Sequence, residues 1–176
     1  MTTSAEHALE GPDALETDRG RNPLVYRQAI AVLSLIAGLV ALYLHLVKIG
    51  VFGFPACGRG NECVQAWFSS YGSFLGYDVA LIGAVGYGVL TLVAIIGTLS
   101  KYEDSRRITT IMLVLIVAAV IFTWRLKYGE WVMMKIFCVW CAESFVTIHA
   151  CLVLAWLDRR RLIQSGAAAP VTPRAG

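Results

Sequence analysis

Four of the five cysteines in this sequence fall into two close pairs, Cys57 with Cys63 and Cys138 with Cys141. The second pair has the spacing Cys-x-x-Cys, and residues three apart on a helix share a face, with Cβ atoms roughly 5–6 Å apart. Cys138 and Cys141 can therefore approach disulfide-bonding range with modest adjustment. Close thiol pairs can pass electrons by exchange, in which a thiolate attacks a disulfide. The cysteine pattern therefore indicates redox chemistry.

The first pair lies in a segment of different character. Glycines and a proline surround Cys57 and predict a mobile loop there. Asn61 is suited to be an N-cap, so we expect Cys63 in the first turn of a helix, facing inward, where the helix dipole favours a thiolate. The apolar residues that follow recur at helical spacing and predict an amphipathic helix. They are Val64, Trp67, Phe68, Tyr71, Phe74 and Leu75.

Two other uses of the cysteines remain open. Four thiolates can bind zinc, although structural zinc sites usually lie in soluble loops. The pairs can also be structural disulfides, although a bridge between residues three apart closes a loop too short to stabilise much. The alternative to an enzyme is therefore a non-enzymatic metal-binding or structural membrane protein. Cys151 stands alone and is expected to pack as a small apolar residue.

The elements that must position these cysteines are membrane helices. Hydrophobic residues make up 57% of the 176 residues, too many for a soluble globule. They gather in four runs, each near the roughly 20 residues that cross a bilayer as a helix. The runs are 29–47, 79–99, 108–124 and 136–157. The predicted fold class is an all-α membrane protein, a four-transmembrane-helix bundle with an extracytoplasmic loop carrying a short amphipathic helix.

The distribution of basic residues predicts how these helices are oriented. With both termini in the cytoplasm, most lysines and arginines fall on the inner side, and the loop 48–78 lies outside. The basic residues flank the apolar runs and form no patch, so we expect contact with membrane lipid and no nucleic-acid binding. The predicted organisation is a disordered cytoplasmic tail (1–28), a transmembrane redox domain (29–158) and a flexible cytoplasmic tail (159–176), in the plasma or inner membrane.

From Cys57 to Phe145 the chain resembles the vitamin K epoxide reductase family, especially its bacterial members that drive disulfide formation. The resemblance lies in the five-residue spacing of Cys57 and Cys63, in Ser69, in a glycine-rich start of the second membrane helix from Gly76 to Gly83 with Gly86-Tyr87, and in Cys138-Val139-Trp140-Cys141. Many members carry a fused thioredoxin-like domain. Here none is evident, so we expect the partner to be a separate thioredoxin-like protein.

The resemblance implies a role for each paired cysteine. A reduced thioredoxin-like partner would attack Cys57, the freed Cys63 would attack Cys138, and the released Cys141 thiolate would reduce a membrane quinone. The implied cofactor is ubiquinone or menaquinone, without a metal. Ser69 matches the loop serine that supports the cysteine centre in the family. From the residues alone it is equally well read as a loop hydroxyl that bonds to the local backbone.

Two departures from the family concern the quinone. Many relatives carry Pro-Asn where this sequence has Asp78-Val79, and the animal enzymes carry a tyrosine at the position of Phe145. Both departures favour a respiratory quinone over an epoxide as substrate, held mainly by apolar and aromatic packing. The candidate quinone-binding residues are Val79, Tyr87 and Phe145.

Three acidic or histidine side chains fall within the predicted spans. Glu143 is expected to pair with Arg125 or Lys127, or to be protonated, because an isolated charge in the bilayer is costly. His149 shares a helix face with the cysteines but lies deep along the helix, so we expect a hydrogen-bonded core histidine and not a proton relay to the quinone. The sequence does not decide the role of His45.

Overall fold

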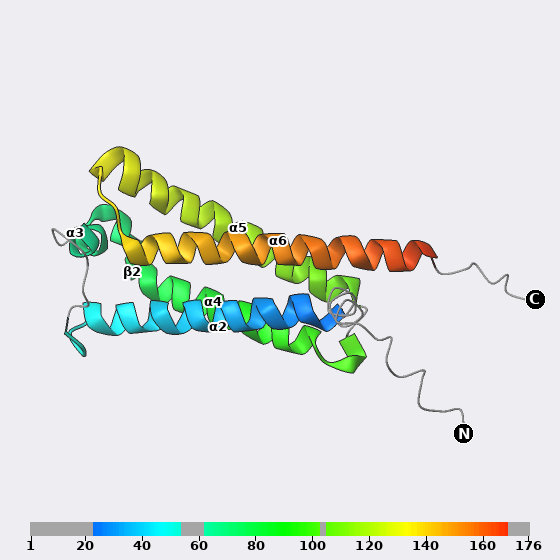
Figure 1. Cartoon of the computed structure of the whole chain (residues 1–176). Coiled ribbons are helices and arrows are strands. Elements are labelled where there is room, and N and C mark those ends of the chain that lie inside the picture. The colour runs from blue at the N-terminus through cyan, green and yellow to red at the C-terminus, as the bar shows by residue number, and fades with distance from the viewer. Residues whose placement is uncertain (1–22, 54–61, 103–104, 169–176) are drawn as a thin grey trace, which may run out of the picture.

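The computed structural model describes residues 23–53, 62–102 and 105–168. Four long helices dominate it: α2 (Pro23–Lys48), α4 (Val79–Gly97), α5 (Arg106–Tyr128) and α6 (Val139–Ala168). Each is long and apolar enough to cross a membrane. Figure 1 shows them running along one another, with the start of α2 and the end of α6 at the same end of the bundle. The predicted all-α bundle of four membrane helices is confirmed.

Three of the helices extend beyond the apolar runs that predicted them, whereas α4 ends at Gly97, two residues before the predicted end at Leu99. α2 begins at Pro23, a residue suited to the first helical turn because the N–H that proline lacks would be unpaired there. α6 continues to Ala168 through the arginines that follow its apolar run, since arginine is a good helix former. An apolar run marks the part of a helix that crosses hydrocarbon and not its ends. Residues 1–22 and 169–176 of the two predicted tails lie outside the described residues.

The connection from α5 to α6 changes helix type. α5 continues into the π-helix η4 (Gly129–Met134), which ends at Lys135 with φ of 52°. Few residues other than glycine adopt this left-handed conformation, and here it redirects the chain before α6. α6 therefore begins at Val139 and not at Ile136 as predicted. Cys138 directly precedes α6, and its carbonyl oxygen accepts the first helical hydrogen bond, from the N–H of Ala142 at 3.0 Å.

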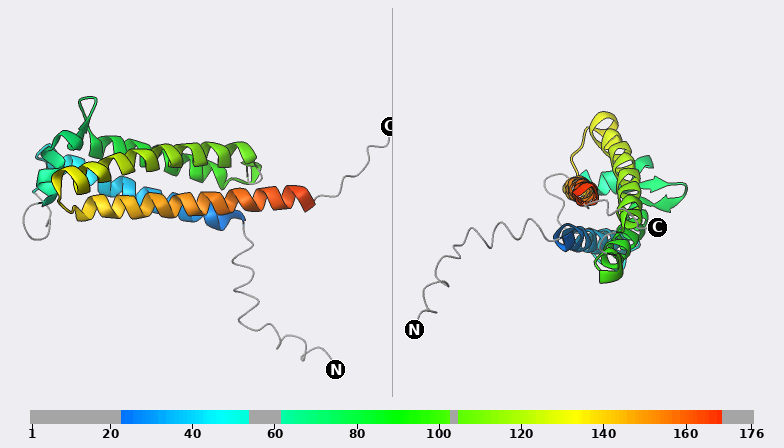
Figure 2. Two further views of the ribbon diagram at one scale, coloured as in Figure 1. Left: turned by 90° about the horizontal axis from the view of Figure 1, so that it is seen from above. Right: turned by 90° about the vertical axis from the view of Figure 1, so that its right-hand side faces the viewer.

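Small side chains let the helices pack closely. α2 packs against α4 and α6, and α5 packs against α6 and α4, as the end-on view in Figure 2 shows. The buried core includes Ala37 of α2, Ala94 of α4 and Ala155 of α6, and such residues allow close approach of helix backbones in membranes. Cys151 is fully buried in this core. Its predicted role in packing is confirmed.

Residues 62–78 form a cap at one end of the bundle. The cap consists of helix α3 (Glu62–Phe68), the 3-10 turn η2 (Ser70–Gly72) and an antiparallel hairpin of β1 (Ser73–Phe74) and β2 (Tyr77–Asp78). Figure 1 places α3 and β2 at the end of the bundle away from the start of α2, and Figure 2 shows the hairpin projecting sideways.

The cap corrects the predicted amphipathic helix, which ends at Phe68 and does not reach Leu75. Phe68 is 61% exposed and Leu75 is 82% exposed, whereas Tyr71 and Phe74 are half-buried, so the predicted residues do not form one continuous helix face. Glycine causes the change of direction. A Cβ atom at Gly72 would lie only 2.0 Å from the carbonyl oxygen of Trp67, so only glycine fits there. Gly76 then turns the hairpin with φ of 83°.

A buried polar cluster joins the helices at the opposite end. Arg27 of α2 forms an ion pair of 3.0 Å with Asp158 of α6, and it donates to Thr109 Oγ1 of α5 at 3.0 Å. It also donates to the carbonyl oxygen of Gly97 on α4 at 2.6 Å. From the sequence alone, Arg27 is one of the basic residues that flank the predicted spans. Its side chain is instead buried and links all four helices.

Candidate active site

Cys63 and Cys138 meet between the cap and the start of α6. Both are 0% exposed, and their side chains form a hydrogen bond. They belong to one apolar cluster with Leu44 and Val47 of α2 and with Trp67 of α3. The short helix α3 therefore places the second loop cysteine against the first cysteine of the Cys-x-x-Cys motif. Its partner in the loop pair, at position 57, lies outside the described residues.

The two cysteines of the Cys-x-x-Cys motif have different surroundings. Cys138 is buried, whereas Cys141 is partly exposed. The backbone N–H of Cys141 points to Cys138 Sγ, with a nitrogen–sulfur distance of 3.4 Å. A side-chain hydrogen bond with Cys141, together with burial, raises the pKa of the Cys138 thiol. Negative charge is therefore disfavoured on Cys138.

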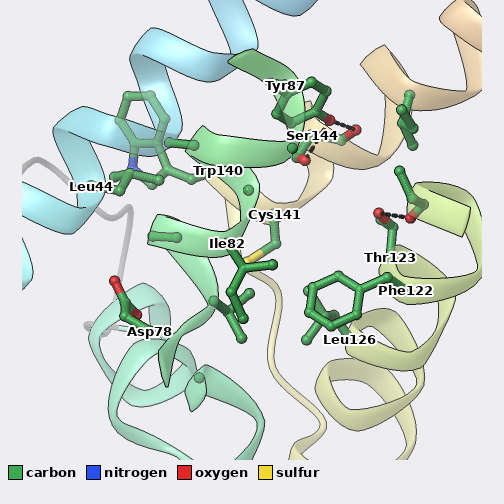
Figure 3. A pocket seen from close by; sticks show the side chains of 18 of the residues that line it. Leu44, Asp78, Ile82, Tyr87, Phe122, Thr123, Leu126, Trp140, Cys141 and Ser144 are labelled. Atoms are coloured by element: carbon green, nitrogen blue, oxygen red, sulfur yellow. Dashed lines mark hydrogen bonds between the residues drawn. The ribbon is translucent and has the colours of Figure 1, made fainter. Parts of the chain in front are cut away.

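Cys141 faces a cavity of about 450 Å³ between the helices, a volume within the range of small-molecule sites. Figure 3 shows its sulfur directed toward Ile82 of α4, with Phe122 and Leu126 of α5 nearby. The lining is mainly apolar and comes from α2, the cap, α4, α5, η4 and α6. Cys63 and Cys138 are not part of it. The motif therefore has one sulfur toward the cap and the other toward the cavity.

The candidate quinone-binding residues separate into two groups. Val79 and Tyr87 line the cavity, and Tyr87 Oη lies 2.9 Å from Ser144 Oγ (Figure 3). Phe145 does not line it. Its ring packs edge-on against Trp124, with ring centroids 5.3 Å apart. The cavity thus receives two of the three predicted residues.

A buried ion pair that the sequence did not predict lies beside the cysteines. The carboxylate of Glu130 accepts the backbone N–H of Cys138 through Oε1, and its Oε2 lies 2.7 Å from Lys127 Nζ. The side chains of Lys127 and Glu130 are only 1% and 3% exposed, and both residues line the cavity. The available signal was the three-residue spacing of Lys127 and Glu130, just beyond the third apolar run. Opposite charges at this spacing near the end of a span can pair, and charged side chains are rarely buried unless they do.

The sequence profile of the vitamin K epoxide reductase family matches residues 28–156, most of the chain. The chain belongs to this family. Vitamin K epoxide reductase family proteins are membrane thiol–disulfide oxidoreductases, and the four apolar helices make this member an integral membrane protein. No curated protein sequence matches the chain significantly.

Ser69, the counterpart of the vitamin K epoxide reductase loop serine, serves the local backbone of the cap. It is the N-cap of η2, where its Oγ accepts the N–H of Tyr71 at 3.2 Å and donates to the carbonyl oxygen of Ala66 at 2.7 Å. These bonds join α3 to η2. Ser69 therefore helps to hold the end of α3, the helix that carries Cys63, against η2.

Asp78, at the first departure from the vitamin K epoxide reductase pattern, fastens the cap to α2. Its Oδ1 lies 2.7 Å from Lys48 Nζ, and its Oδ2 lies 2.7 Å from His45 Nδ1. Lys48 also donates to the carbonyl oxygen of Gly72 at 3.0 Å. Burial opposes ionisation of Asp78, but the hydrogen bonds from Lys48 and His45 outweigh it and lower the pKa of the carboxyl below its ordinary value of 3.8. His45, whose role the sequence does not decide, thus forms with Lys48 and Asp78 the polar cluster that holds the cap against α2, here called the latch.

His149 and Glu143 do not take part in the cavity. Trp124 Nε1 donates to His149 Nε2 at 3.2 Å, and Nδ1 lies 2.7 Å from the carbonyl oxygen of Phe145, so both ring nitrogens are satisfied as predicted. The ion pair predicted between Glu143 and Lys127 is wrong, because Lys127 pairs with Glu130. Glu143 instead accepts a hydrogen bond from Thr147, one turn along α6, at 3.1 Å.

Arg125, the other partner predicted for Glu143, lies over the ring of Phe74, with 4.9 Å between its guanidinium carbon and the ring centroid.

The alternative of a zinc site has no support in the part of the chain that the structure describes. No three Cys, His, Asp or Glu side chains are placed there to share a metal ion.

Proposed function

We propose that this membrane oxidoreductase reoxidises a thioredoxin-like partner and passes the electrons to a membrane quinone. The observation that carries the proposal is the position of Cys138 between the other two cysteines. It contacts Cys63 on the cap side, and Cys141, three residues on, faces the cavity. A series of sulfurs therefore leads from the cap to a cavity of small-molecule size. Such an arrangement suits stepwise thiol–disulfide exchange.

Each proposed exchange between thiols breaks one disulfide and forms another, and the last step forms a disulfide while it reduces the quinone. The partner dithiol reduces the Cys57–Cys63 disulfide and leaves oxidised. The Cys63 thiolate then attacks Cys138, the Cys138–Cys141 bond breaks, and its electron pair leaves on Cys141. Attack of Cys57 on Cys63 releases Cys138 and restores the loop disulfide. The reduced Cys138–Cys141 pair finally gives two electrons and two protons to the quinone, which becomes quinol.

The cavity supports a quinone as the acceptor. Its apolar lining suits an isoprenoid quinone from the bilayer, and the sulfur of Cys141 lies at its wall. Asp78 with Lys48, and Glu130 with Lys127, place two ion pairs at the same cavity. The site is therefore more polar than the two departures from the family predicted. Ion pairs of this kind can orient the polar ring of a quinone while the apolar wall holds its chain.

The orientation in the membrane follows from the basic residues. Arg106 and Arg107 at the start of α5, and Arg159, Arg160 and Arg161 on α6, lie toward the end where α2 begins. The positive-inside rule assigns this end to the cytoplasm and the cap to the extracytoplasmic side. The thioredoxin-like partner then meets the cap in an oxidising compartment, where disulfides persist.

The Cys141→Ala variant tests the sulfur relay. In this variant the Cys138 thiolate can attack only the loop disulfide, at Cys63, and Cys57 leaves as a thiolate. Because no Cys141 thiol is present to displace Cys63 from Cys138, a mixed disulfide of Cys63 and Cys138 should accumulate and appear in non-reducing peptide mapping. Cys151→Ala is the matched control, because Cys151 lies in the bundle core and should leave the pattern unchanged. Alkylation of both Cys63 and Cys138 in Cys141→Ala under oxidising conditions would contradict the relay.

Quinone dependence is tested with the wild-type protein in detergent. After reduction and removal of the reductant, added ubiquinone or menaquinone should re-form the Cys138–Cys141 disulfide and yield one quinol per pair. Thiols that stay reduced under anaerobic conditions with either quinone would contradict the proposed acceptor. Release of a bound metal ion on chelation, with no change in thiol count, would instead favour the metal-binding alternative.

A further inference from the structure

Two carboxylates from other parts of the chain bind the backbone just before α6. Glu130 accepts the N–H of Cys138, and Glu62, the first residue of α3, accepts the N–H of Phe137 at 3.2 Å. The π-helix and the left-handed residue Lys135 bring Glu130 back to the start of α6, and the N–H of Ile136 donates to the carbonyl oxygen of Glu130 at 3.2 Å. The conformation of this connection therefore places a carboxylate against the backbone of Cys138.

This position matters for the charge on the cysteines. The N-terminus of a long helix carries partial positive charge and normally favours a thiolate on a residue that caps it. Cys138 is such a residue, because its sulfur accepts the N–H of Cys141 in the first turn of α6. A nearby carboxylate has the opposite effect, since it disfavours a second negative charge. Glu130 therefore opposes the α6 dipole at Cys138.

The other groups around Cys138 do not cancel this effect. From α2 it meets the apolar side chains of Leu44 and Val47, and from α3 it meets Cys63, next to the carboxylate of Glu62. From α5 comes Lys127, whose ammonium binds Glu130 Oε2, whereas the oxygen that accepts the N–H of Cys138 is Oε1. On α6 itself the titratable neighbour is Cys141.

We propose that Glu130 is a positioning residue that keeps negative charge off Cys138 and thereby directs it to Cys141 at the cavity. The inference rests on the proposed relay. When Cys63 attacks the Cys138–Cys141 disulfide, the sulfur that forms the new bond is Cys138 and the one that leaves with the electron pair is Cys141. The better leaving group in thiol–disulfide exchange is the thiol that more readily carries charge. Glu130 makes Cys141 that thiol and so delivers the thiolate to the quinone side.

The first experiment measures charge at Cys138 without using the relay. The parent protein for this experiment has Cys57, Cys63 and Cys141 replaced by serine, and the titration of Cys138 is followed by the ultraviolet absorbance of its thiolate. The other cysteine that remains, Cys151, is buried in the bundle core. Glu130→Gln should lower the midpoint by about one pH unit, a tenfold rise in the thiolate-to-thiol ratio below the midpoint. Gln keeps an acceptor for the Cys138 N–H, so a purely structural role predicts no shift.

Lys127→Met is the matched control, because it leaves the carboxylate without its cation and should not lower the midpoint. The double variant Lys127→Met with Glu130→Gln removes both buried charges together, which proteins tolerate better than the loss of one partner. Its midpoint should lie between those of Glu130→Gln and the parent. Equal midpoints in the double variant and the parent, or a higher one in Glu130→Gln, would overturn the proposal even if the single variant folds poorly.

The second experiment uses the full set of cysteines. In Glu130→Gln, attack by Cys63 should lose its direction, so that trapped disulfides of Cys63 with Cys141 appear beside those with Cys138, and quinone reduction should fall at least tenfold. Unchanged regiochemistry together with a normal Cys138–Cys63 trap in Cys141→Ala would refute the role of Glu130 while leaving the relay intact. Absence of any trap in Cys141→Ala would refute the relay itself.

Discussion

Arg27 and Asp158 form an ion pair of 3.0 Å in which each side chain is 1% exposed, at the end of the bundle away from the cysteines. The pair joins the first membrane helix to the last, and Thr109 donates to the same Asp158 oxygen at 2.8 Å. Burial makes such a pair sensitive to the loss of one partner, because the remaining charge has neither water nor a counterion.

Asp158→Ala should therefore destabilise the bundle by about 3–5 kcal/mol, the usual cost of stranding a buried charge. The measurement is thermal or denaturant unfolding of the detergent-solubilised protein. Arg107→Ala, an exposed arginine on α5, is the control and should change stability little. A variant at Asp158 as stable as the control would show that Arg27 finds another partner.

Gly72→Ala should displace the cap. The added Cβ would lie 2.0 Å from the carbonyl oxygen of Trp67 and 2.9 Å from that of Ala66, and backbone atoms cannot move aside cheaply. Since α3 carries Cys63, the expected result is a marked loss of the Cys63–Cys138 trap in the Cys141→Ala background. Gly88→Ala, where the new Cβ meets nothing within 4 Å, should trap normally. A normal yield of the Cys63–Cys138 disulfide in Gly72→Ala would show that the relay does not depend on the position of the cap.

The latch at Asp78 should respond to acid only at low pH. Lys48 and His45 lower the pKa of Asp78 in the folded protein, so the ionised carboxylate stabilises the fold fully above pH 3.8, the ordinary pKa of the group. This stabilisation is lost as the pH falls through the lower pKa of the folded protein. Asp78→Asn should therefore lower the unfolding temperature at neutral pH, and the difference from wild type should shrink below about pH 4. A difference that disappears already near pH 6 would contradict the assignment.

Filling the cavity should separate electron entry from electron exit. Gly86 lines the cavity and has no atom within 4 Å of an added Cβ, so Gly86→Leu can place a side chain in the proposed quinone space. Quinone reduction should fall at least tenfold, whereas exchange between the loop pair and Cys138 should persist. Gly88→Leu, on the same helix but outside the cavity lining, is the matched control. Equal loss in both variants would point to a general defect of α4.

The predicted residues differ in how far periodicity alone could place them. The four spans followed from apolar runs, because a membrane helix must be apolar over its whole crossing length. The apolar stripe after Cys63 predicts a helix beyond Phe68 that the structure does not contain, because helical periodicity cannot reveal that Gly72 packs against the carbonyl group of Trp67. Phe145 was assigned to the quinone from its place in the family pattern, and packing against Trp124 puts its ring elsewhere.

The sequence by itself determined the membrane bundle, the family and the cysteine pairs, because these depend on hydropathy and on spacing along one chain. Only the tertiary structure decided that Cys138 faces Cys63 while Cys141 faces the cavity, and that Glu130 reaches the backbone of Cys138. Those contacts depend on the π-helix and on the left-handed Lys135, which redirect the chain between two helices. Local residue preferences do not encode such a reversal, because it is stabilised by the partners it brings together.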